Sequence, residues 1–189
     1  GRGVTEVSEF YFKYAQIEQK PYATSFVDGT RSPETLTIPT AGVLNPQEGT
    51  VECWVYVNDI IKRQLGGSSN GMIVHIPRLN NNVGIYLTHR GDSPVWEFRT
   101  YADDGSYTTK TVSDSYTPNG WHFFTLRWGV DRVDLFIDGI LRGTISNPKL
   151  PSSFYDIAYV GCGGSGNHIN TLIDDLRISN RARTDEEIA

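Results

Sequence analysis

The stretch "TVECWVYV", residues 50–57, alternates strictly between two kinds of side chain. A chain that alternates with a period of two is typical of a β-strand, because successive side chains of a strand point to opposite faces of the sheet. One side of this strand is small and apolar, and the other is polar and aromatic: Val51, Cys53, Val55 and Val57 against Glu52, Trp54 and Tyr56. The stretch therefore predicts a strand with one buried face and one mixed face.

Runs of the same kind recur along the rest of the chain, separated by residues that favour turns. The chain has 189 residues with 38% hydrophobic residues, 19 Gly and 9 Pro, which suits one core built from many short strands. Asp138-Gly139 predicts a hairpin turn. We expect an all-β, two-sheet antiparallel jelly-roll sandwich. The further strands are expected at residues 72–76, 83–88, 95–101, 121–128, 133–137, 157–160 and 172–178.

One helical signal stands at the end of the chain. Thr184 is followed three residues later by Glu187, the spacing of a capping box, in which each side chain bonds the other residue's amide. This predicts a single short turn of helix.

Alternation also divides the strand residues between the core and the outer faces. The expected core residues are Val51, Cys53, Val55, Ile85, Leu87, Trp96, Phe98, Phe124, Leu126, Trp128, Leu135 and Ile137.

Charge and composition exclude several classes of partner. The net charge is -5 and no dense cluster of Lys and Arg occurs, which argues against nucleic acid and anionic membranes. No apolar run is long enough to span a membrane, and no signal peptide is recognisable. Cys53 and Cys162 are expected as free thiols, because a chain of this size needs no disulfide.

Three segments together resemble a known family: "GTVECWVYV" (49–57), "GWHFFTLRWGVDRVDLFIDGILRGT" (120–144) and "YVGCGGSGNHINTLIDDLRISNRARTDEEIA" (159–189). They are similar to the laminin-G-like, concanavalin A-like lectin/glucanase domains of bacterial surface and phage tail proteins. The resemblance covers residues 21–189. It implies the sandwich fold, which hosts lectins, adhesion modules and glycosidases alike.

The first residues resemble a different feature. "EFYFKYAQIEQKPYATSFVDGTR" (9–31) is similar to a junction between modules of phage tail proteins. It implies that residues 1–20 form the closing strand of a preceding module, although Gly1-Arg2-Gly3 also reads as a cloning remnant. The alternative is that this strand pairs with the main sandwich. The resemblance also implies a location in a virion tail or at a cell surface, beside neighbouring modules of the same polypeptide.

The same family implies a structural calcium ion. Domains of this kind commonly hold calcium with the loop after the first strand and an acid on the last strand, which are the places of Asp28, Thr30 and Asp174. Oxygen ligands of this type suit calcium. Asp175 is the adjacent alternative, and a simple turn at Asp28-Gly29 is the other interpretation.

The polar register of the strands supplies the candidate ligand-binding residues, if these strands share the concave sheet. Sugars need aromatic rings for their C–H faces and charged groups for their hydroxyls. Packing under a loop, or cross-strand charge pairs, would account for the same residues. A second candidate surface is formed by the loop residues His89, Arg90, Tyr107, Tyr116 and His168. The candidates on the sheet are Trp54, Tyr56, Tyr86, Arg99, Tyr101 and Arg127.

No catalytic residues are expected. Glycosidases of this fold carry paired acids on one strand, as Glu-x-Asp-x-Glu or Glu-x-Asp-x-x-Glu, and neither pattern occurs. Glu52 and Glu97 remain a conceivable pair on one face for a hydrolase or lyase. The sequence favours a non-catalytic carbohydrate-binding or adhesion module for bacterial cell-surface polysaccharide. The alternative is a structural or oligomerising module of a fibre.

Overall fold

The computed structural model describes residues 36–58, 70–90, 93–163, 167–169 and 171–188. The expectations for residues 1–20, for Asp28 and for Thr30 therefore lie outside the described residues. The described strands all belong to one compact unit, residues 35–189.

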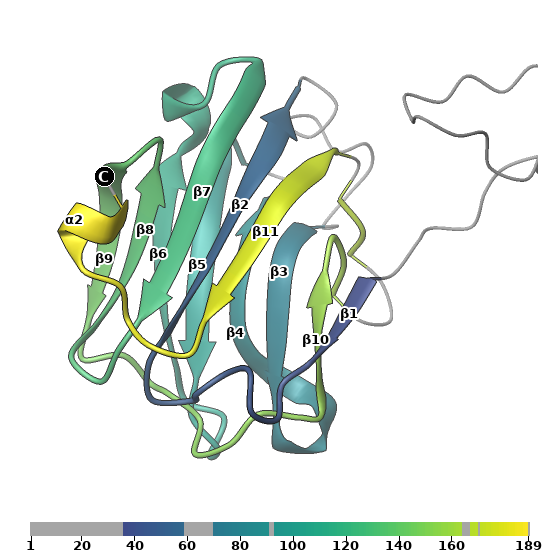
Figure 1. Ribbon diagram of the computed structural model, residues 1–189, viewed down its shortest axis with the longest axis vertical. Coiled ribbons are helices and arrows are strands. Elements are labelled where there is room, and N and C mark those ends of the chain that lie inside the picture. Colours follow the sequence, from purple (N-terminus) through teal and green to yellow (C-terminus); the bar gives the residue numbers. More distant parts are fainter. Residues whose placement is uncertain (1–35, 59–69, 91–92, 164–166, 170, 189) are drawn as a thin grey trace, which may run out of the picture. The chain divides into compact units, whose positions relative to one another are not determined.

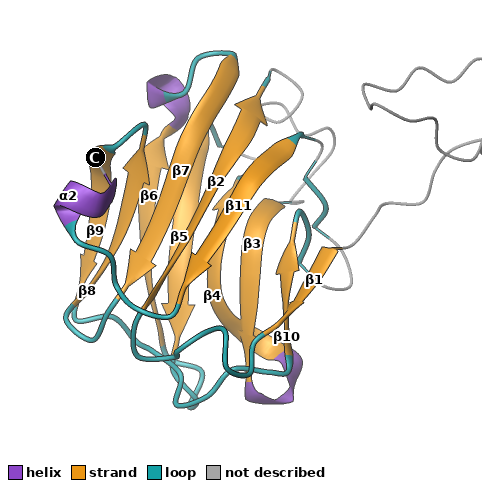
Figure 2. Ribbon diagram, in the orientation of Figure 1, coloured by secondary structure: helices purple, strands orange, loops and turns teal. Residues whose placement is uncertain are grey.

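Two antiparallel sheets make up this unit, and Figures 1 and 2 show them as two layers. The six-stranded sheet has the order β1-β10-β3-β4-β5-β6, and the five-stranded sheet has the order β11-β2-β7-β8-β9. The strands of the first sheet are β1 (Leu36–Pro39), β10 (Ile157–Val160), β3 (Gly71–Arg78), β4 (Asn82–His89), β5 (Val95–Tyr101) and β6 (Tyr107–Ser113). The strands of the second are β11 (Ile173–Ser179), β2 (Gly49–Val57), β7 (Gly120–Trp128), β8 (Arg132–Ile137) and β9 (Ile140–Ser146). The predicted two-sheet sandwich is confirmed.

The helices of the described part are short. They are two 3-10 turns, η1 (Leu79–Asn81) and η2 (Asp114–Tyr116), and the helix α2 (Asp185–Ile188). None of them is long and apolar enough to cross a membrane.

β2 contains the alternating stretch 50–57, and it lies inside the five-stranded sheet between β11 and β7. Its first residue, Gly49, packs closely against Trp128: a Cβ there would lie 2.1 Å from the Cζ2 atom of the indole. The Trp128 Nε1–H donates to the carbonyl oxygen of Asn45 at 3.0 Å. A glycine is required at the start of β2 because the buried indole occupies the space that a side chain would need.

The core lies between the two sheets, and all twelve residues expected in it are buried there. Trp96 and Trp128 are its largest buried side chains. The Trp96 Nε1–H donates to the Thr117 hydroxyl at 3.0 Å, so this buried indole keeps a polar partner. Cys53 and Cys162 are buried free thiols, as expected. Burial, and then the neighbouring Glu52 carboxylate, raise the pKa of Cys53 to about 12.

β6 was missed by the sequence analysis. Its sequence, YTTKTVS, buries the side chain of Val112 and leaves its other residues exposed or half-buried, so it has no apolar face to read. It pairs with β5 through seven residues and forms the edge of the sheet. Edge strands are often polar, because a polar edge resists pairing with other chains.

The chain after β11 crosses the outer face of the five-stranded sheet and ends in α2, beside β8 and β9 (Figure 1). We call residues 180–188 the C-terminal segment. The predicted capping box is formed in half: the Glu187 carboxylate accepts from the amide of Thr184 at 2.9 Å. The amide of Glu187 donates to the carbonyl oxygen of Thr184 and not to its hydroxyl.

Candidate functional site

The structure divides the six predicted ligand-binding residues between two faces. Tyr86, Arg99 and Tyr101 lie on β4 and β5, in the six-stranded sheet. Trp54, Tyr56 and Arg127 lie on β2 and β7, in the five-stranded sheet. Since the core separates the two outer faces, the six residues do not form one site, and the condition that these strands share one sheet is not met.

Arg99 is the centre of a cluster on the outer face of the six-stranded sheet. It is in register with Tyr86 on β4, and Tyr101 is in register with Tyr107 on β6. Its guanidinium carbon lies 4.7 Å from the centre of the Tyr107 ring, 5.6 Å from that of Tyr86 and 5.9 Å from that of Tyr101. Its Nη1 donates to the Tyr101 hydroxyl at 3.0 Å. We call Tyr86, Glu97, Arg99, Tyr101 and Tyr107 the tyrosine–arginine cluster.

Glu97 fixes the geometry of this cluster. The residue is 2% exposed, although its side chain points away from the core. It accepts from the Tyr86 hydroxyl at 2.8 Å, from Arg99 Nη2 at 3.0 Å and from Arg90 Nη1 at 3.1 Å. Burial, and then the hydrogen bond to Glu97, raise the pKa of Tyr86, so its hydroxyl keeps its proton and remains a donor. The network holds the Arg99 side chain in one orientation.

The β6 side of the cluster is open to solvent. Tyr107 is 53% exposed, and its ring lies 5.1 Å from the ring of Tyr101. Thr109 and Thr111 are exposed and in register with Arg99 and Glu97. Tyr107 was assigned to a loop from the sequence, whereas it is the first residue of β6. The alternation of Tyr107, Thr109 and Thr111 was the signal that could have placed these residues on the face.

On the β10 side the same face is closed. His75 and Tyr159 are in register, and their rings stack with 5.8 Å between centres. Burial lowers the pKa of His75 to about 4, and neither ring nitrogen has a hydrogen-bond partner among the described residues. This end of the face therefore offers a neutral, buried ring.

The outer face of the five-stranded sheet carries a second group of aromatic side chains. The Trp54 and Phe123 rings lie 5.3 Å apart, and the Tyr56 and Trp121 rings lie 5.5 Å apart, in each case across β2 and β7. Trp54 is 39% exposed and Trp121 is 44% exposed. We call these four residues the tryptophan cluster. Trp121 and Phe123 were not predicted as site residues, although the alternation of β7 places them beside Trp54 and Tyr56.

Arg127 occupies the other half of this face, where it fastens the C-terminal segment. Its Nη1 donates at 2.7 Å to the carbonyl oxygen of Arg183 and to the carboxylate of Asp185, and its Nη2 donates to Asp134 at 2.7 Å. Arg183 in turn forms an ion pair with Glu52. Arg127 was predicted to bind a ligand, but its guanidinium is already hydrogen-bonded to Arg183, Asp185 and Asp134 of the same chain.

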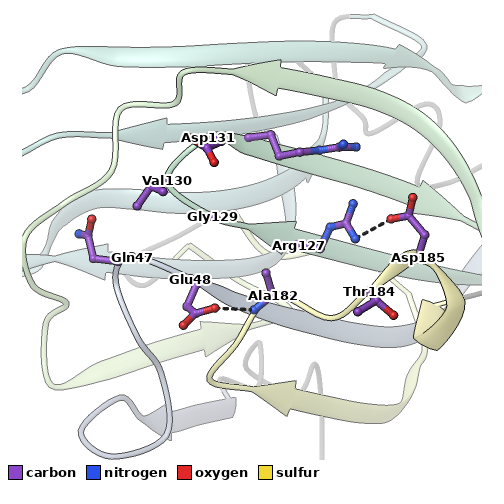
Figure 3. A pocket seen from close by; sticks show the side chains of 10 residues that line it. Gln47, Glu48, Arg127, Gly129, Val130, Asp131, Ala182, Thr184 and Asp185 are labelled. Atoms are coloured by element: carbon purple, nitrogen blue, oxygen red, sulfur yellow. Dashed lines mark hydrogen bonds and ion pairs between the residues drawn. The ribbon is translucent and has the colours of Figure 1, made fainter.

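A pocket of about 590 Å³ opens beside Arg127. Figure 3 shows Arg127 and Asp185 joined by a dashed line on one side, and Glu48 joined to Ala182 on the other. The lining comes from β7, the turn after it and the start of β8, from the residues before β2 and from the C-terminal segment. The pocket is thus the gap between this segment and the sheet.

The other loop candidates do not converge. His89 is buried at the end of β4, with its ring 4.7 Å from the core residue Trp96, and Arg90 reaches Glu97. Tyr116 lies in η2 under the guanidinium of Arg142, at 4.3 Å. His168 is half-buried in the segment before β11.

Asp174 is the one expected calcium ligand among the described residues. It is exposed on β11, in register with Trp54, and its Oδ1 accepts from the amide of Asp175 at 2.8 Å. Asp175 is engaged by Arg177 at 2.6 Å, so Asp174 is the freer carboxylate of the two. Its oxygen suits calcium. Within the described ranges no three His, Cys, Asp or Glu side chains gather as a metal site, and the expected partners Asp28 and Thr30 lie outside them.

The conceivable acid pair is not formed. Glu52 lies on β2 in the five-stranded sheet, and Glu97 lies on β5 in the six-stranded sheet. Glu52 forms an ion pair with Arg183, and Glu97 is bonded to Arg90 and Arg99. Since the core lies between them, these two carboxylates cannot flank one glycosidic bond.

Comparison with solved structures gives the same fold. The ligand-binding domain of botulinum neurotoxin serotype D in complex with N-acetylneuraminic acid has a TM-score of 0.62 and 14% identity, over 82% of this chain and 38% of that one. The serotype G binding domain has a TM-score of 0.61 and 14% identity, over 82% and 39%. The chain thus spans about two fifths of these structures, and at this identity the likeness is one of fold.

No curated protein matches the sequence. A family model does match, over residues 28–189, and it is that of the laminin-G-like group described as the concanavalin A-like lectin/glucanases superfamily. The match spans both sheets and all of the described strands. The chain therefore belongs to the concanavalin A-like lectin/glucanase superfamily.

Proposed function

We propose that the domain is a non-catalytic carbohydrate-binding module that takes a bacterial cell-surface polysaccharide on the tyrosine–arginine cluster. One observation carries the proposal: the Arg99 guanidinium is held by Glu97 and Tyr101 over the ring of Tyr107, which is itself exposed to solvent.

The cluster meets the two needs of a sugar ligand. The exposed Tyr107 ring offers a surface on which the C–H face of a sugar can pack. Arg99, Thr109 and Thr111 offer donors and acceptors for its hydroxyls along the same face. The network orients Arg99 before a ligand arrives, so binding loses less side-chain entropy.

The comparisons support recognition as the activity at the level of the fold. The structural neighbours include binding domains of botulinum neurotoxins, and one of them is in complex with N-acetylneuraminic acid. A fold alone does not define a ligand, so the sugar class rests on the side chains of the cluster.

The separation of Glu52 from Glu97 supports a role without catalysis. We place the domain in a larger virion-tail or cell-surface protein, next to other modules of the same polypeptide, with calcium bound by Asp28, Thr30 and Asp174. This context follows from the resemblance of the sequence to modules of that kind.

A structural or oligomerising module is the second candidate. The exposure of Trp54 and Trp121 on the outer face of the five-stranded sheet favours it, because large exposed apolar side chains often mark contact surfaces. Concentration-dependent elution from a sizing column, with no response to any glycan, is the result that this candidate predicts.

A glycan array of bacterial cell-wall and capsular polysaccharides tests the proposal, with calcium present and then removed by chelator. We expect saturable binding to a subset of the array and no release of reducing sugar from the bound glycans. Release of reducing sugar would assign the domain to the hydrolases. No binding to any glycan of the array would favour the structural or oligomerising module.

A further inference from the structure

The paired rings of the tryptophan cluster are inclined to each other and are not coplanar. Trp54 and Phe123 are inclined by 51° to each other, and Tyr56 and Trp121 by 68°. The two pairs are neighbours along β2 and β7, so the four rings form a two-by-two array on the outer face of the sheet. An extended glycan could not stack flat on both rings of either pair, because these rings are not coplanar.

The cluster is flanked by negative charge. The exposed Asp174 is in register with Trp54 on the neighbouring strand, and its carboxylate forms no ion pair with another described residue. The face of an aromatic ring is itself negative because of its quadrupole. Both features favour a ligand with positive charge.

Other aromatic groups of the chain are already paired with the chain's own cations. Arg99 lies over Tyr107, Arg142 over Tyr116 and Arg127 over Phe136, at 4.7, 4.3 and 5.0 Å from the ring centres. In the described part of the chain, no guanidinium or ammonium group lies over the rings of the tryptophan cluster. Among these aromatic groups of the described residues, the tryptophan cluster is the one over which no cation of the chain lies.

The exposed area is small for a second copy of the chain. An aromatic side chain buries up to about 250 Å², so rings exposed by 39% and 44% offer roughly 100 Å² each. With Leu172, which is also exposed near Tyr56, the patch amounts to a few hundred Å². A stable interface needs about 800 Å² from each partner. The area fits a small group better than a dimer.

We infer that the tryptophan cluster and Asp174 form a binding site for a quaternary ammonium group, separate from the glycan face. The methyl groups of such a cation would pack against the exposed rings of Trp54 and Trp121. Its charge would be compensated by the Asp174 carboxylate when that group holds no calcium ion. This site does not depend on the glycan proposal, since it lies on the opposite sheet.

Titration of the full chain with choline in the presence of a calcium chelator tests the inference, with intrinsic fluorescence as the readout. Of the four tryptophans, Trp96 and Trp128 are fully buried, so a quenched signal reports on the two exposed ones. The matched control ligand is 3,3-dimethylbutan-1-ol, which has the shape of choline without its charge. We expect saturation by choline and at least about 10-fold weaker binding of the neutral alcohol.

Three variants localise the site: Trp54→Ala, Trp121→Ala and Asp174→Asn, all at exposed positions. Each is expected to weaken choline binding at least about 5-fold in chelator, where no calcium ion competes for the Asp174 carboxylate. Tyr116→Ala in η2 serves as the unaffected control. A second arm with phosphatidylcholine vesicles identifies the source of the cation: co-flotation would indicate a lipid headgroup, and a response to free choline without co-flotation would indicate a soluble or polymer-borne cation.

Equal binding of choline and the neutral alcohol would overturn the inference, because the cluster would then be an apolar surface only. No response to choline, together with self-association that Trp121→Ala abolishes, would overturn it as well and assign the patch to a second copy. Neither result changes the outcome expected on the glycan array.

Discussion

Arg127 on β7 and Asp134 on β8 form a buried ion pair, with 2.7 Å between Nη2 and Oδ2. The same guanidinium donates to the carbonyl oxygen of Arg183. This pair lies under the C-terminal segment, so the sheet and the end of the chain depend on one side chain. Burial acts to raise the pKa of Asp134, but hydrogen bonds from Arg132, Arg127 and Thr144 hold it below its usual range.

Removal of the Asp134 carboxylate is expected to be costly. Asp134→Ala leaves the buried Arg127 without its main partner, so we expect the free energy of unfolding to fall by about 3–5 kcal/mol. Arg132→Ala, on the exposed side of the same network, is expected to cost about 1 kcal/mol or less. Urea unfolding of both variants checks this, and a similar small loss for both would mean that the buried pair contributes little.

Acidification is expected to destabilise the protein through His75. Its pKa in the folded state is about 4, below the value of 6.5 for an exposed histidine, so the unfolded chain binds the proton first as the pH falls. The contribution of the neutral ring is complete above pH 6.5 and is lost between pH 6.5 and pH 4. A difference of this size corresponds to about 2 kcal/mol between pH 7 and pH 5.

His75→Phe isolates this effect, because it keeps a ring stacked on Tyr159 and removes the titrating group. Carboxylates of the protein also titrate as the pH falls. The measured quantity is therefore the difference in pH dependence of stability between the wild type and His75→Phe. We expect the variant to lose less stability than the wild type between pH 7 and pH 5 in urea unfolding. Parallel curves would show that His75 is hydrated and titrates normally.

Calcium is expected to stabilise the domain through Asp28, Thr30 and Asp174. Calcium at about 100 times its dissociation constant would add about 2.7 kcal/mol, which raises the melting temperature by several degrees. Asp174→Asn should reduce this response, whereas Trp54→Ala, whose side chain is in register with Asp174 but offers no oxygen, should retain it. A melting temperature that is the same in chelator and in millimolar calcium would contradict the site.

Much of the fold could be predicted because apolar and polar side chains alternate with a period of two along the strands of the core. Val51, Cys53 and Val55 alternate with polar residues, and the structure buries them as the pattern indicates. β6 could not be found in this way, because an edge strand with one buried side chain shows no apolar alternation. Alternation assigns a side chain to the inner or outer face, but it does not say which of the two sheets a strand joins.

This limit explains why the six candidate binding residues do not share one face. Trp54 and Tyr86 both point outward, as predicted, but strand pairing places them on opposite sides of the core. Arg127 and Glu52 are held by the C-terminal segment, a contact over more than 50 residues of sequence that no local pattern announces. Trp121 and Phe123 could have been predicted as residues of the outer face, since they alternate with more buried residues on β7.

Calorimetric titration of the strongest glycan from the array into the wild type, Tyr107→Ala and Tyr116→Ala tests the central claim most directly. Both tyrosines are exposed, so neither change should unfold the domain, and they separate the tyrosine–arginine cluster from the loops. We expect Tyr107→Ala to weaken binding by at least about 10-fold, since a stacked ring contributes roughly 1–2 kcal/mol, and Tyr116→Ala to bind as the wild type does. Unchanged affinity in Tyr107→Ala would contradict the assignment of the glycan to this face.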